Sequence, residues 1–556
     1  MEISHNIRRM VTSFVSMVDI LIVILFMFMK ISNKNNGDDI SVMLFSFVDL
    51  LFVGYFLLRI IFQFGKRISH DLVIIVIEIV ALYESILGIL QIIGVIKSNN
   101  YLFLCTGTFD NPGPLGGFLA ICISISIAVV HEKTVNRGKK PCSTFDKMIL
   151  MMSYLSITFC TILIPSTQSR AALLSIIFTS FIYLSKESII RSWIIDHLFF
   201  FIITIIFLMS LVLIFKRPSL NGRLITYKME LMTIIRNEYK GVGLGHFSNA
   251  YGKTQREYFS KSIYINEGDL IYSESDKERI FADNPKVGFN DYLQFGIEFG
   301  VGPLILLLLF IMLIGFRLFK YDSPLCQGLI SLIVFAFFSY PFSIWAFRLL
   351  FIVFAAYAGS EIKVNNSPRG CNLFFALIYI VPLAIFFGSI EVIRTIHQYE
   401  TKWESQRFIF GNGDYLSYEY CCSQLYPNMK HNCAFLYEYA YSLYMNRDLV
   451  GSETIVNQSL TLSGNALLFI LLGDIHKEMG LIKEAEKDYL DSFFAIPDRL
   501  YPMYKLAVLY HDSNQITNYH NTVRSIDNFH PRIESQATND IRDMLNELND
   551  PNDESM

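Results

Sequence analysis

The stretch 105-CTGTFDNPGPLGGFLA-120 is compact, polar and rich in Gly and Pro, yet it lies in a strongly apolar part of the chain. Its Asn111 directly precedes Pro112, a combination typical of a tight turn. The apolar runs 71–96 and 115–131 lie on either side of it, and each is long enough for a helix to cross most of a bilayer core. We therefore expect a turn at a membrane surface, between two spanning helices.

Composition divides the chain into two parts. Of the 556 residues, 53% are hydrophobic, and the mean hydropathy of +0.40 is well above that of soluble proteins. The apolar bias stops near Arg394, where the chain becomes polar and rich in Tyr. The expected fold class is all-α: a polytopic membrane helix bundle at 1–393 with a large outer loop at 216–289, followed by a soluble α-helical repeat domain at 394–556.

Charge and cysteine content exclude some classes of function. A net charge of -4 gives no case for nucleic-acid binding. The nine cysteines follow no metal-ligand spacing, so we expect no bound metal. A disulfide in the polar tail would have to form among Cys421, Cys422 and Cys433.

The length and hydropathy of the apolar runs predict about eleven membrane spans, with the first one retained rather than cleaved as a signal peptide. The candidate segments are 11–31, 41–64, 71–96, 115–131, 147–165, 170–185, 192–215, 290–318, 324–345, 347–361 and 371–393. Lys and Arg gather in alternate connections, which places those connections in the cytoplasm. The loop 216–289 and the tail 394–556 then both face outward.

Two outward arginines are candidate binding groups. Arg170 is the sole charge in the short turn 166-STQSRA-171, where the sidedness rule disfavours it, although an arginine at a membrane boundary can simply extend its charge to the interface. Arg223 lies in the first turn of an amphipathic helix expected to begin near Asn221. Because arginine forks suit a diphosphate, a lipid-linked diphosphate is the natural ligand for such an outer face.

The rest of the outer loop holds glycines, one His and carboxylates. The GVGLG run contains Gly243 and Gly245, but no strand precedes it and no Lys-Ser/Thr follows, so we expect it to pack tightly on the membrane surface rather than to bind a nucleotide. His246 is the only His of this loop, and it is either structural or functional. Asp291 and Glu298 are seven residues apart on one helix face, which makes them candidate bases or acceptor-binding groups.

Charged residues inside the predicted spans need partners. Arg59 and Glu78 would lie at similar depth in adjacent antiparallel spans, so we expect a structural ion pair between them. A transporter would instead use such groups in a proton relay.

Four motifs, in order, resemble the O-antigen ligase and polymerase superfamily. They are GTFDNPGPLGGFLA, TQSRAALLS, NGRLITYKMELM followed by GVGLGHF, and FNDYLQFGIEFGVGPL, all within residues 100–345. Members of this family are glycosyltransferases of the bacterial inner membrane. They move glycans from an undecaprenyl-diphosphate carrier on the periplasmic side and need no metal or other cofactor. The resemblance therefore implies a multi-pass inner-membrane protein with a periplasmic C-terminal domain.

The resemblance also assigns roles to individual residues. Arg170 and Arg223 match the family arginines that would bind the donor diphosphate and stabilise charge on the leaving group. The residues that would shape the site are Asn111, Pro112, Gly243, Gly245 and Asn290. The family's His-Asn pair, whose His is the proposed general base, reads Phe289-Asn290 here. Either Asp291, His246 or Glu298 replaces that base, or the reaction needs none, or the chain is not an active ligase; Asp291 is our first choice because it is two residues away.

The polar tail repeats at intervals of about 34 residues, as tetratricopeptide repeats do. Small residues recur at Ala440, Gly473 and Ala507, which predicts helix pairs at about 433–465, 466–498 and 500–532. We allow for a fourth, degenerate unit before these three, and the alternative to a repeat is a non-repetitive helical bundle. Such arrays are usually binding surfaces, so a protein partner or acceptor outside the membrane is implied.

The leading hypothesis is transfer of a glycan from a lipid-linked diphosphate to a hydroxyl acceptor in contact with membrane lipid. The acceptor would be lipid A core, another lipid-linked glycan (as in a polymerase) or a protein (as in an O-oligosaccharyltransferase), and the tail favours the first. A transporter or flippase predicts an inverted internal repeat, which the sequence does not show. A non-catalytic scaffold that presents the repeat array is the third class of function.

Overall fold

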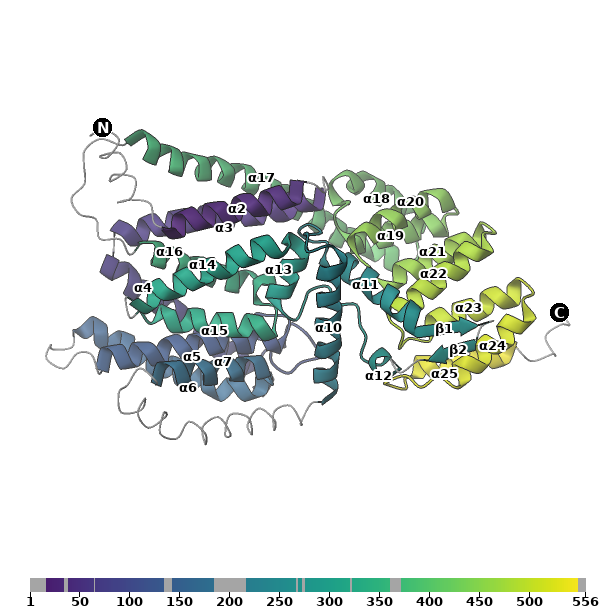
Figure 1. The fold of residues 1–556 in the computed structure, drawn as a ribbon, viewed down its shortest axis with the longest axis horizontal. Helices are drawn as coiled ribbons and strands as arrows, with labels where there is room; N and C mark the ends of the chain where they lie inside the picture. The colour runs from purple at the N-terminus through teal and green to yellow at the C-terminus, as the bar shows by residue number, and fades with distance from the viewer. Residues whose placement is uncertain are drawn as a thin grey trace.

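The computed structural model describes residues 17–34, 39–64, 66–134, 143–184, 217–266, 269–272, 276–320, 323–360 and 372–548. The predicted span 192–215 lies outside these residues. The described chain is almost entirely helical, with a bundle of apolar helices at one end and an array of helix pairs at the other (Figure 1). The expected all-α class is thereby confirmed, apart from one short hairpin in the outer loop.

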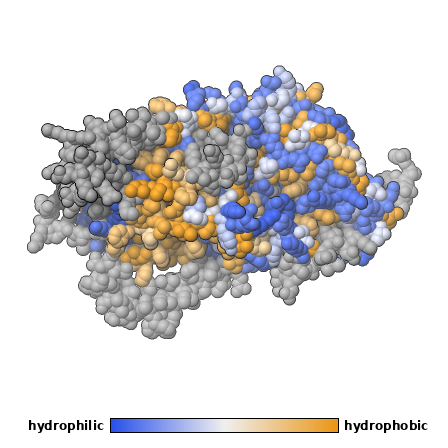
Figure 2. All heavy atoms as spheres, turned by 45° about the horizontal axis from the view of Figure 1, so that its top comes forward, coloured by the Kyte–Doolittle hydropathy of each residue, from blue (hydrophilic) through white to orange (hydrophobic). Residues whose placement is uncertain are grey.

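The bundle consists of α2 (Met17–Lys34), α3 (Asp39–Phe64), α4 (Lys66–Ile93), α5 (Pro112–Thr134), α6 (Thr144–Thr167), α7 (Arg170–Leu184), α14 (Val301–Lys320), α15 (Leu325–Phe338), α16 (Trp345–Ser360) and the start of α17 (Asn372–Gly411). Four of its segments are long and apolar enough to cross a bilayer: His70–Ile93, Pro112–Thr134, Thr144–Thr167 and Val301–Lys320. Helix α5 is the most buried of these four, because its neighbours surround it. On the face that Figure 2 shows, apolar side chains predominate over the bundle, whereas the array is mainly polar.

The predicted span 290–318 is two helices rather than one. Helix α13 (Asp291–Phe299) ends at Gly300, whose φ of 91° few residues other than glycine adopt, and α14 starts at Val301. Gly300 pairs with Lys240 of the outer loop in an antiparallel bridge, and the Val301 N–H donates to the Tyr239 carbonyl. The break lets the outer loop dock against the top of α14.

The predicted ion pair between Arg59 and Glu78 is wrong. Arg59 instead binds Asp19 on α2, with an Nε–Oδ1 distance of 2.7 Å, and Tyr55 donates to the same carboxylate at 2.5 Å. Glu78 accepts hydrogen bonds from Ser126 and Ser153. Similar depth in adjacent spans did not decide the partner of Arg59, because a third helix supplies the carboxylate of Asp19. Glu78 is hydrogen-bonded by serine hydroxyls instead.

The outer loop consists of α10 (Arg217–Arg236), α11 (Phe247–Ser262), the antiparallel strands β1 (Ile263–Asn266) and β2 (Asp269–Tyr272), and α12 (Asp276–Arg279). Helix α10 stands across the junction between the bundle and the array (Figure 1).

The tail folds into helix hairpins: α19 (Cys433–Met445) with α20 (Leu449–Leu462), α21 (Ala466–Glu478) with α22 (Ile482–Ala495), and α23 (Tyr501–Asp512) with α24 (Ile516–Asp527). The end of α17 pairs with α18 (Tyr415–Met429) before them, and α25 (Gln536–Leu548) follows. The hairpins match the three ranges expected from the repeat. Gly473 shows why a small residue recurs there, since an added Cβ would lie 2.5 Å from the Tyr489 ring.

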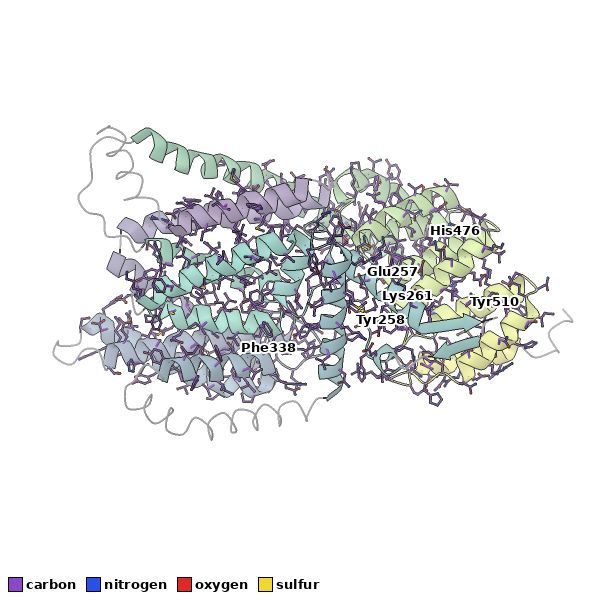
Figure 3. The ribbon with its side chains drawn as sticks, in the orientation of Figure 1. Glu257, Tyr258, Lys261, Phe338, His476 and Tyr510 are labelled. Atoms are coloured by element: carbon purple, nitrogen blue, oxygen red, sulfur yellow. The ribbon has the colours of Figure 1, made fainter. Side chains whose placement is uncertain are left out.

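The outer loop and the helix array share one hydrophobic core. Met229, Phe247 and Tyr251 of the loop pack in the same buried cluster as Tyr489 and Phe493 of the array. Figure 3 shows Glu257 and Tyr258 of α11 at this junction, with Phe338 at the end of α15 on the bundle side. Helix α17 also continues through residue 394 without a break, so the array is joined to the bundle by a helix and by a packed interface.

Candidate functional site

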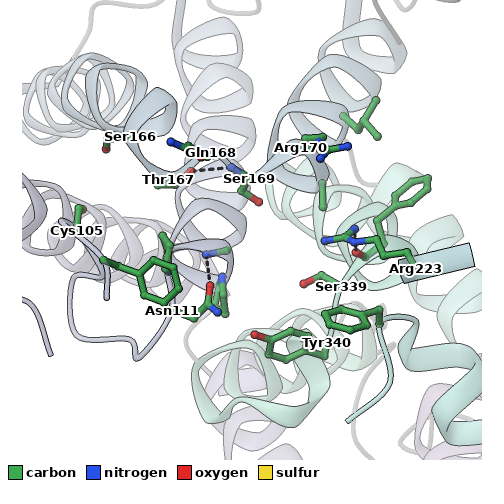
Figure 4. Close-up of a pocket in the computed structure, with 18 of the residues that line it drawn as sticks. Cys105, Asn111, Ser166, Thr167, Gln168, Ser169, Arg170, Arg223, Ser339 and Tyr340 are labelled. Atoms are coloured by element: carbon green, nitrogen blue, oxygen red, sulfur yellow. Dashed lines mark hydrogen bonds between the residues drawn. The ribbon is translucent and has the colours of Figure 1, made fainter. Parts of the chain in front are cut away.

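A cavity of about 640 Å³ opens where the bundle meets the outer loop. Segments that are far apart in sequence line it: the turn 102–105 with 111–114, the turn 166–171, the start of α10, Phe289, and residues 338–340. Figure 4 shows Arg170 and Arg223 projecting from two different helices towards the same space, with Asn111, Ser339 and Tyr340 around it. We call it the arginine cavity.

Arg223 is held in the cavity wall by two neighbours, Phe338 and Phe289. Its Nη1 donates to the Phe338 carbonyl at 2.7 Å, and its guanidinium lies 5.5 Å from the centre of the Phe289 ring. One helical turn later, the Tyr227 hydroxyl donates to the Phe289 carbonyl at 3.3 Å. Burial raises the pKa of Tyr227, and the Arg223 charge offsets part of that rise. The guanidinium therefore has a defined position rather than a free, solvated one.

Arg170 begins α7 directly after a tight turn. Gln168 has a left-handed φ of 49° and ends α6, and the Ser169 N–H donates to the Thr167 hydroxyl. Arg170 and Arg223 are close enough for their charges to repel each other. Two positive side chains are thus brought together at one cavity, an arrangement that an anion with several oxygens would stabilise.

The polar turn that contains Asn111 and Pro112 forms the opposite rim of the arginine cavity. Glu84 and Gln91 of α4 hold it from below: Glu84 accepts from the Thr108 N–H and hydroxyl, and Gln91 bonds the backbone at Thr106 and Gly107. Asn111 accepts from the Gly113 N–H at 2.8 Å at the start of α5. Asn111 and Pro112 therefore shape the cavity as expected, and Glu84 and Gln91, seven residues apart on one helix face, support them.

The three predicted bases lie outside the arginine cavity. Asp291 and Glu298 line a second cavity of about 400 Å³ on the other side of the 289–292 segment. His246 is buried at the start of α11, where its Nδ1 lies 3.2 Å from the Thr461 carbonyl of the array. The seven-residue spacing correctly placed Asp291 and Glu298 on one face of α13, but that face turns away from the arginines.

Gly243, Gly245 and Asn290 line no part of the arginine cavity, and of the three only Gly245 lines the second cavity. Asn290 caps α13 by accepting from the Tyr292 and Leu293 N–H groups. Gly243 and Gly245 have φ values of 101° and 86°, and the Gly243 N–H donates to the Glu298 carbonyl. The GVGLG run therefore packs on the end of α13, whereas we expected it to pack on the membrane surface.

Glu230 is a buried carboxyl that the sequence did not single out. It follows Arg223 by seven residues on the same face of α10, and it is fully buried. Neither oxygen makes a hydrogen bond of normal geometry, although the Phe289 N–H lowers the pKa slightly. Burial is the largest influence and raises the pKa of Glu230 to about 8. The 223–227–230 spacing was the available signal, because it marks one helix face with an arginine, a tyrosine and a glutamate.

Among the described residues, no group of three or more His, Cys, Asp or Glu side chains could hold a metal ion. The tail residues Cys421, Cys422 and Cys433 are free thiols, so no disulfide forms among them. No protein-family model, curated protein or solved structure matches this chain, so the functional interpretation rests on the residues and their geometry.

Proposed function

We propose that the chain is a membrane glycosyltransferase of the O-antigen ligase type. It transfers a glycan from an undecaprenyl-diphosphate carrier to a hydroxyl acceptor, most naturally lipid A core. One observation carries the proposal: Arg170 and Arg223, from separate helices, line a single cavity at the boundary of an apolar bundle.

The cavity suits a diphosphate that is attached to a lipid. Two guanidiniums supply forked donors, and the positive ends of α5 and α7 both open onto the cavity through residues 111–114 and 169–171. The rim is apolar and accessible, since Leu102 is 68% exposed and Leu104 is 81% exposed. A hydrocarbon carrier can lie along that rim while its diphosphate reaches the arginines.

The arginines act mainly on the leaving group. The bond between the sugar and the diphosphate breaks, a bond to the acceptor oxygen forms, and the acceptor proton passes to the departing diphosphate or to water. Fixed positive charge at the place where negative charge develops lowers the barrier to this step. Because Phe289 stands where the family has His, and Asp291, His246 and Glu298 line no part of the arginine cavity, we favour a reaction without a protein base.

The proposal includes a topology. About eleven spans cross the bacterial inner membrane, and the outer loop and the tail lie in the periplasm. The helix hairpins of the tail are tetratricopeptide-like repeats that bind a protein partner or the acceptor. The packing of the tail against α10 and α11 supports a common compartment for both.

The test is to restore a deletion strain with variants of the gene and to analyse surface glycans and glycoproteins on gels. We expect Arg170→Gln and Arg223→Gln each to lower transfer by about a hundredfold or more. Arg236→Gln is the matched control, because Arg236 lies at the far end of the same helix and pairs with Glu257. Normal glycans in both cavity variants would overturn the proposal, as would a deletion that changes no surface glycan.

The same gels identify the acceptor. Loss of glycan from lipid A core with accumulation of long lipid-linked chains indicates a ligase. Single repeat units alone indicate a polymerase, and loss of glycoprotein staining indicates an O-oligosaccharyltransferase.

A further inference from the structure

The second cavity lies back to back with the arginine cavity. The two share the segments 289–292 and 340–343 as a common wall: Phe289 and Tyr340 face one cavity, and Asp291 and Phe342 face the other. The second cavity of about 400 Å³ is within the size range of small-ligand sites. Nothing in the proposed transfer reaction uses it.

One end of this cavity is a hydrocarbon environment. Helices α2 and α3 supply Leu25, Phe26, Leu51 and Phe52, and α14 supplies Phe310. These helices belong to the apolar bundle, and Figure 1 shows α2 and α3 side by side along its edge. The occupant of this end must therefore be apolar.

The other end is polar and carries two cations. Arg348 of α16 donates its Nε to the Phe342 carbonyl, and its guanidinium lies 5.6 Å from the centre of the Trp345 ring. No described carboxylate lies within 4.0 Å of its guanidinium nitrogens, although the charges of Asp291 and Glu298 act on it. Lys286, which is exposed, also lines the cavity. A mostly buried guanidinium without an ion pair calls for an anionic partner.

Burial disfavours the negative charge of the two carboxyl groups at this end. Asp291 accepts from the Phe342 N–H at 2.7 Å, and burial raises its pKa well above the ordinary value, although the Arg348 charge opposes part of that rise. Burial also raises the pKa of Glu298 to about 7, against the hydrogen bonds from the Gln294 amide and the Gly245 N–H and against the Arg348 charge. An anion bound beside these groups would raise both pKa values further, and a protonated carboxyl group donates a hydrogen bond to it.

We propose that the second cavity binds a membrane lipid with a phosphate head. Its hydrocarbon chain lies between α2, α3 and α14, and its phosphate contacts Arg348 and Lys286. Phosphate fits because it accepts hydrogen bonds from a forked guanidinium and from protonated carboxyls together. The proposal is independent of the transferase function, since it concerns a different cavity and different residues.

Binding of tritiated dodecyl phosphate to the full chain in phosphatidylcholine nanodiscs tests this proposal. Arg223→Gln removes any binding by the arginine cavity, and we expect saturable binding to persist in that variant. In the same background, Arg348→Gln should weaken the remaining binding at least tenfold, and Arg348→Lys should weaken it less. Unlabelled dodecyl phosphate should compete, whereas dodecylphosphocholine and inorganic phosphate should compete at least tenfold more weakly.

A second variant tests the proposal independently, in case Arg348→Gln does not fold. Leu51→Trp fills the apolar end and leaves the cations in place, so it should also weaken binding about tenfold. Thermal unfolding of each variant checks that the bundle is intact. Equal binding by wild type, Arg348→Gln and Leu51→Trp would overturn the proposal. Loss in Arg223→Gln alone would assign the binding to the arginine cavity, and full competition by inorganic phosphate would show a plain anion site; each result overturns it too.

Discussion

The difference in stability between the Glu230→Gln variant and wild type should shift in favour of the variant as the pH rises from 5 to 8. Glu230 is fully buried on α10 behind the arginine cavity, and its pKa is raised from 4.5 to about 8. Below about pH 4.5 the carboxyl is protonated in both the folded and the unfolded chain, so burial of its charge has no cost. Between pH 4.5 and 8 only the folded chain keeps the proton, so folding becomes less favourable as the pH rises.

The size of the effect follows from the pKa difference. At 1.36 kcal/mol per pKa unit, the cost at pH 8 is roughly 2 to 5 kcal/mol, the upper end corresponding to the full difference. Gln has nearly the same shape but does not titrate, so the variant escapes this cost. Any penalty from its buried amide is the same at both pH values and cancels in the comparison.

Thermal unfolding in detergent at pH 5 and pH 8 measures the difference. We expect the melting temperature of Glu230→Gln to gain a few degrees on wild type between the two pH values. Glu257→Gln is the control, because Glu257 is an exposed carboxylate of the same loop that pairs with Arg236. The reasoning would be refuted if the melting temperature of Glu230→Gln minus that of wild type were the same at both pH values, or were larger at pH 5.

Three further substitutions test the packing of the bundle, the outer turn and the junction between the outer loop and the array. Gly117→Ala places a Cβ 2.2 Å from a ring carbon of α15, so it should lower the free energy of unfolding by about 1–3 kcal/mol, whereas Gly302→Ala meets nothing within 4 Å and should be tolerated in the same thermal assay. Gln91→Ala removes the side-chain bonds that hold the outer turn, so limited proteolysis should cut residues 97–111 several times faster, and an unchanged rate would contradict that role. Arg279→Ala removes bonds to two carbonyls of the array at 3.0 and 3.1 Å, so hydrogen exchange in α23 and α24 should rise by about tenfold, whereas exposed Arg499→Ala should leave it unchanged.

Several features of the fold could be predicted from the sequence because they depend on local patterns. The composition of the segment around Asn111 and Pro112 predicts the polar turn. The recurring small residues at Ala440, Gly473 and Ala507 predict the helix pairs of the tail. The family resemblance assigned Arg170 and Arg223 to one site, and both side chains line the arginine cavity, whereas the resemblance itself stays a prediction.

The remaining features depend on contacts between distant segments. The break at Gly300 was missed because the mixed segment 290–299 leads directly into the apolar segment 301–318, and only the docking of Lys240 shows why a glycine stands there. Asp291 and Glu298 were placed on one face correctly, but which cavity that face meets depends on α2 and α3, far away in sequence. Burial of Glu230 likewise depends on the Phe289 segment and is not encoded in α10 alone.

The core shared by the outer loop and the array has a consequence for the order of assembly during synthesis. Gln255 donates to the Ala495 carbonyl at a sequence separation of 240 residues, and this contact lies in the packed interface between α11 and α22. The loop residues are synthesised before the array, so their apolar faces stay uncovered until the array has been made and packs against them. The helix that carries Arg223 acquires its final support only when the C-terminal half has been translated. A truncated chain would keep its apolar helices but leave this arginine on an incompletely packed helix, so incomplete products would be open to proteolysis.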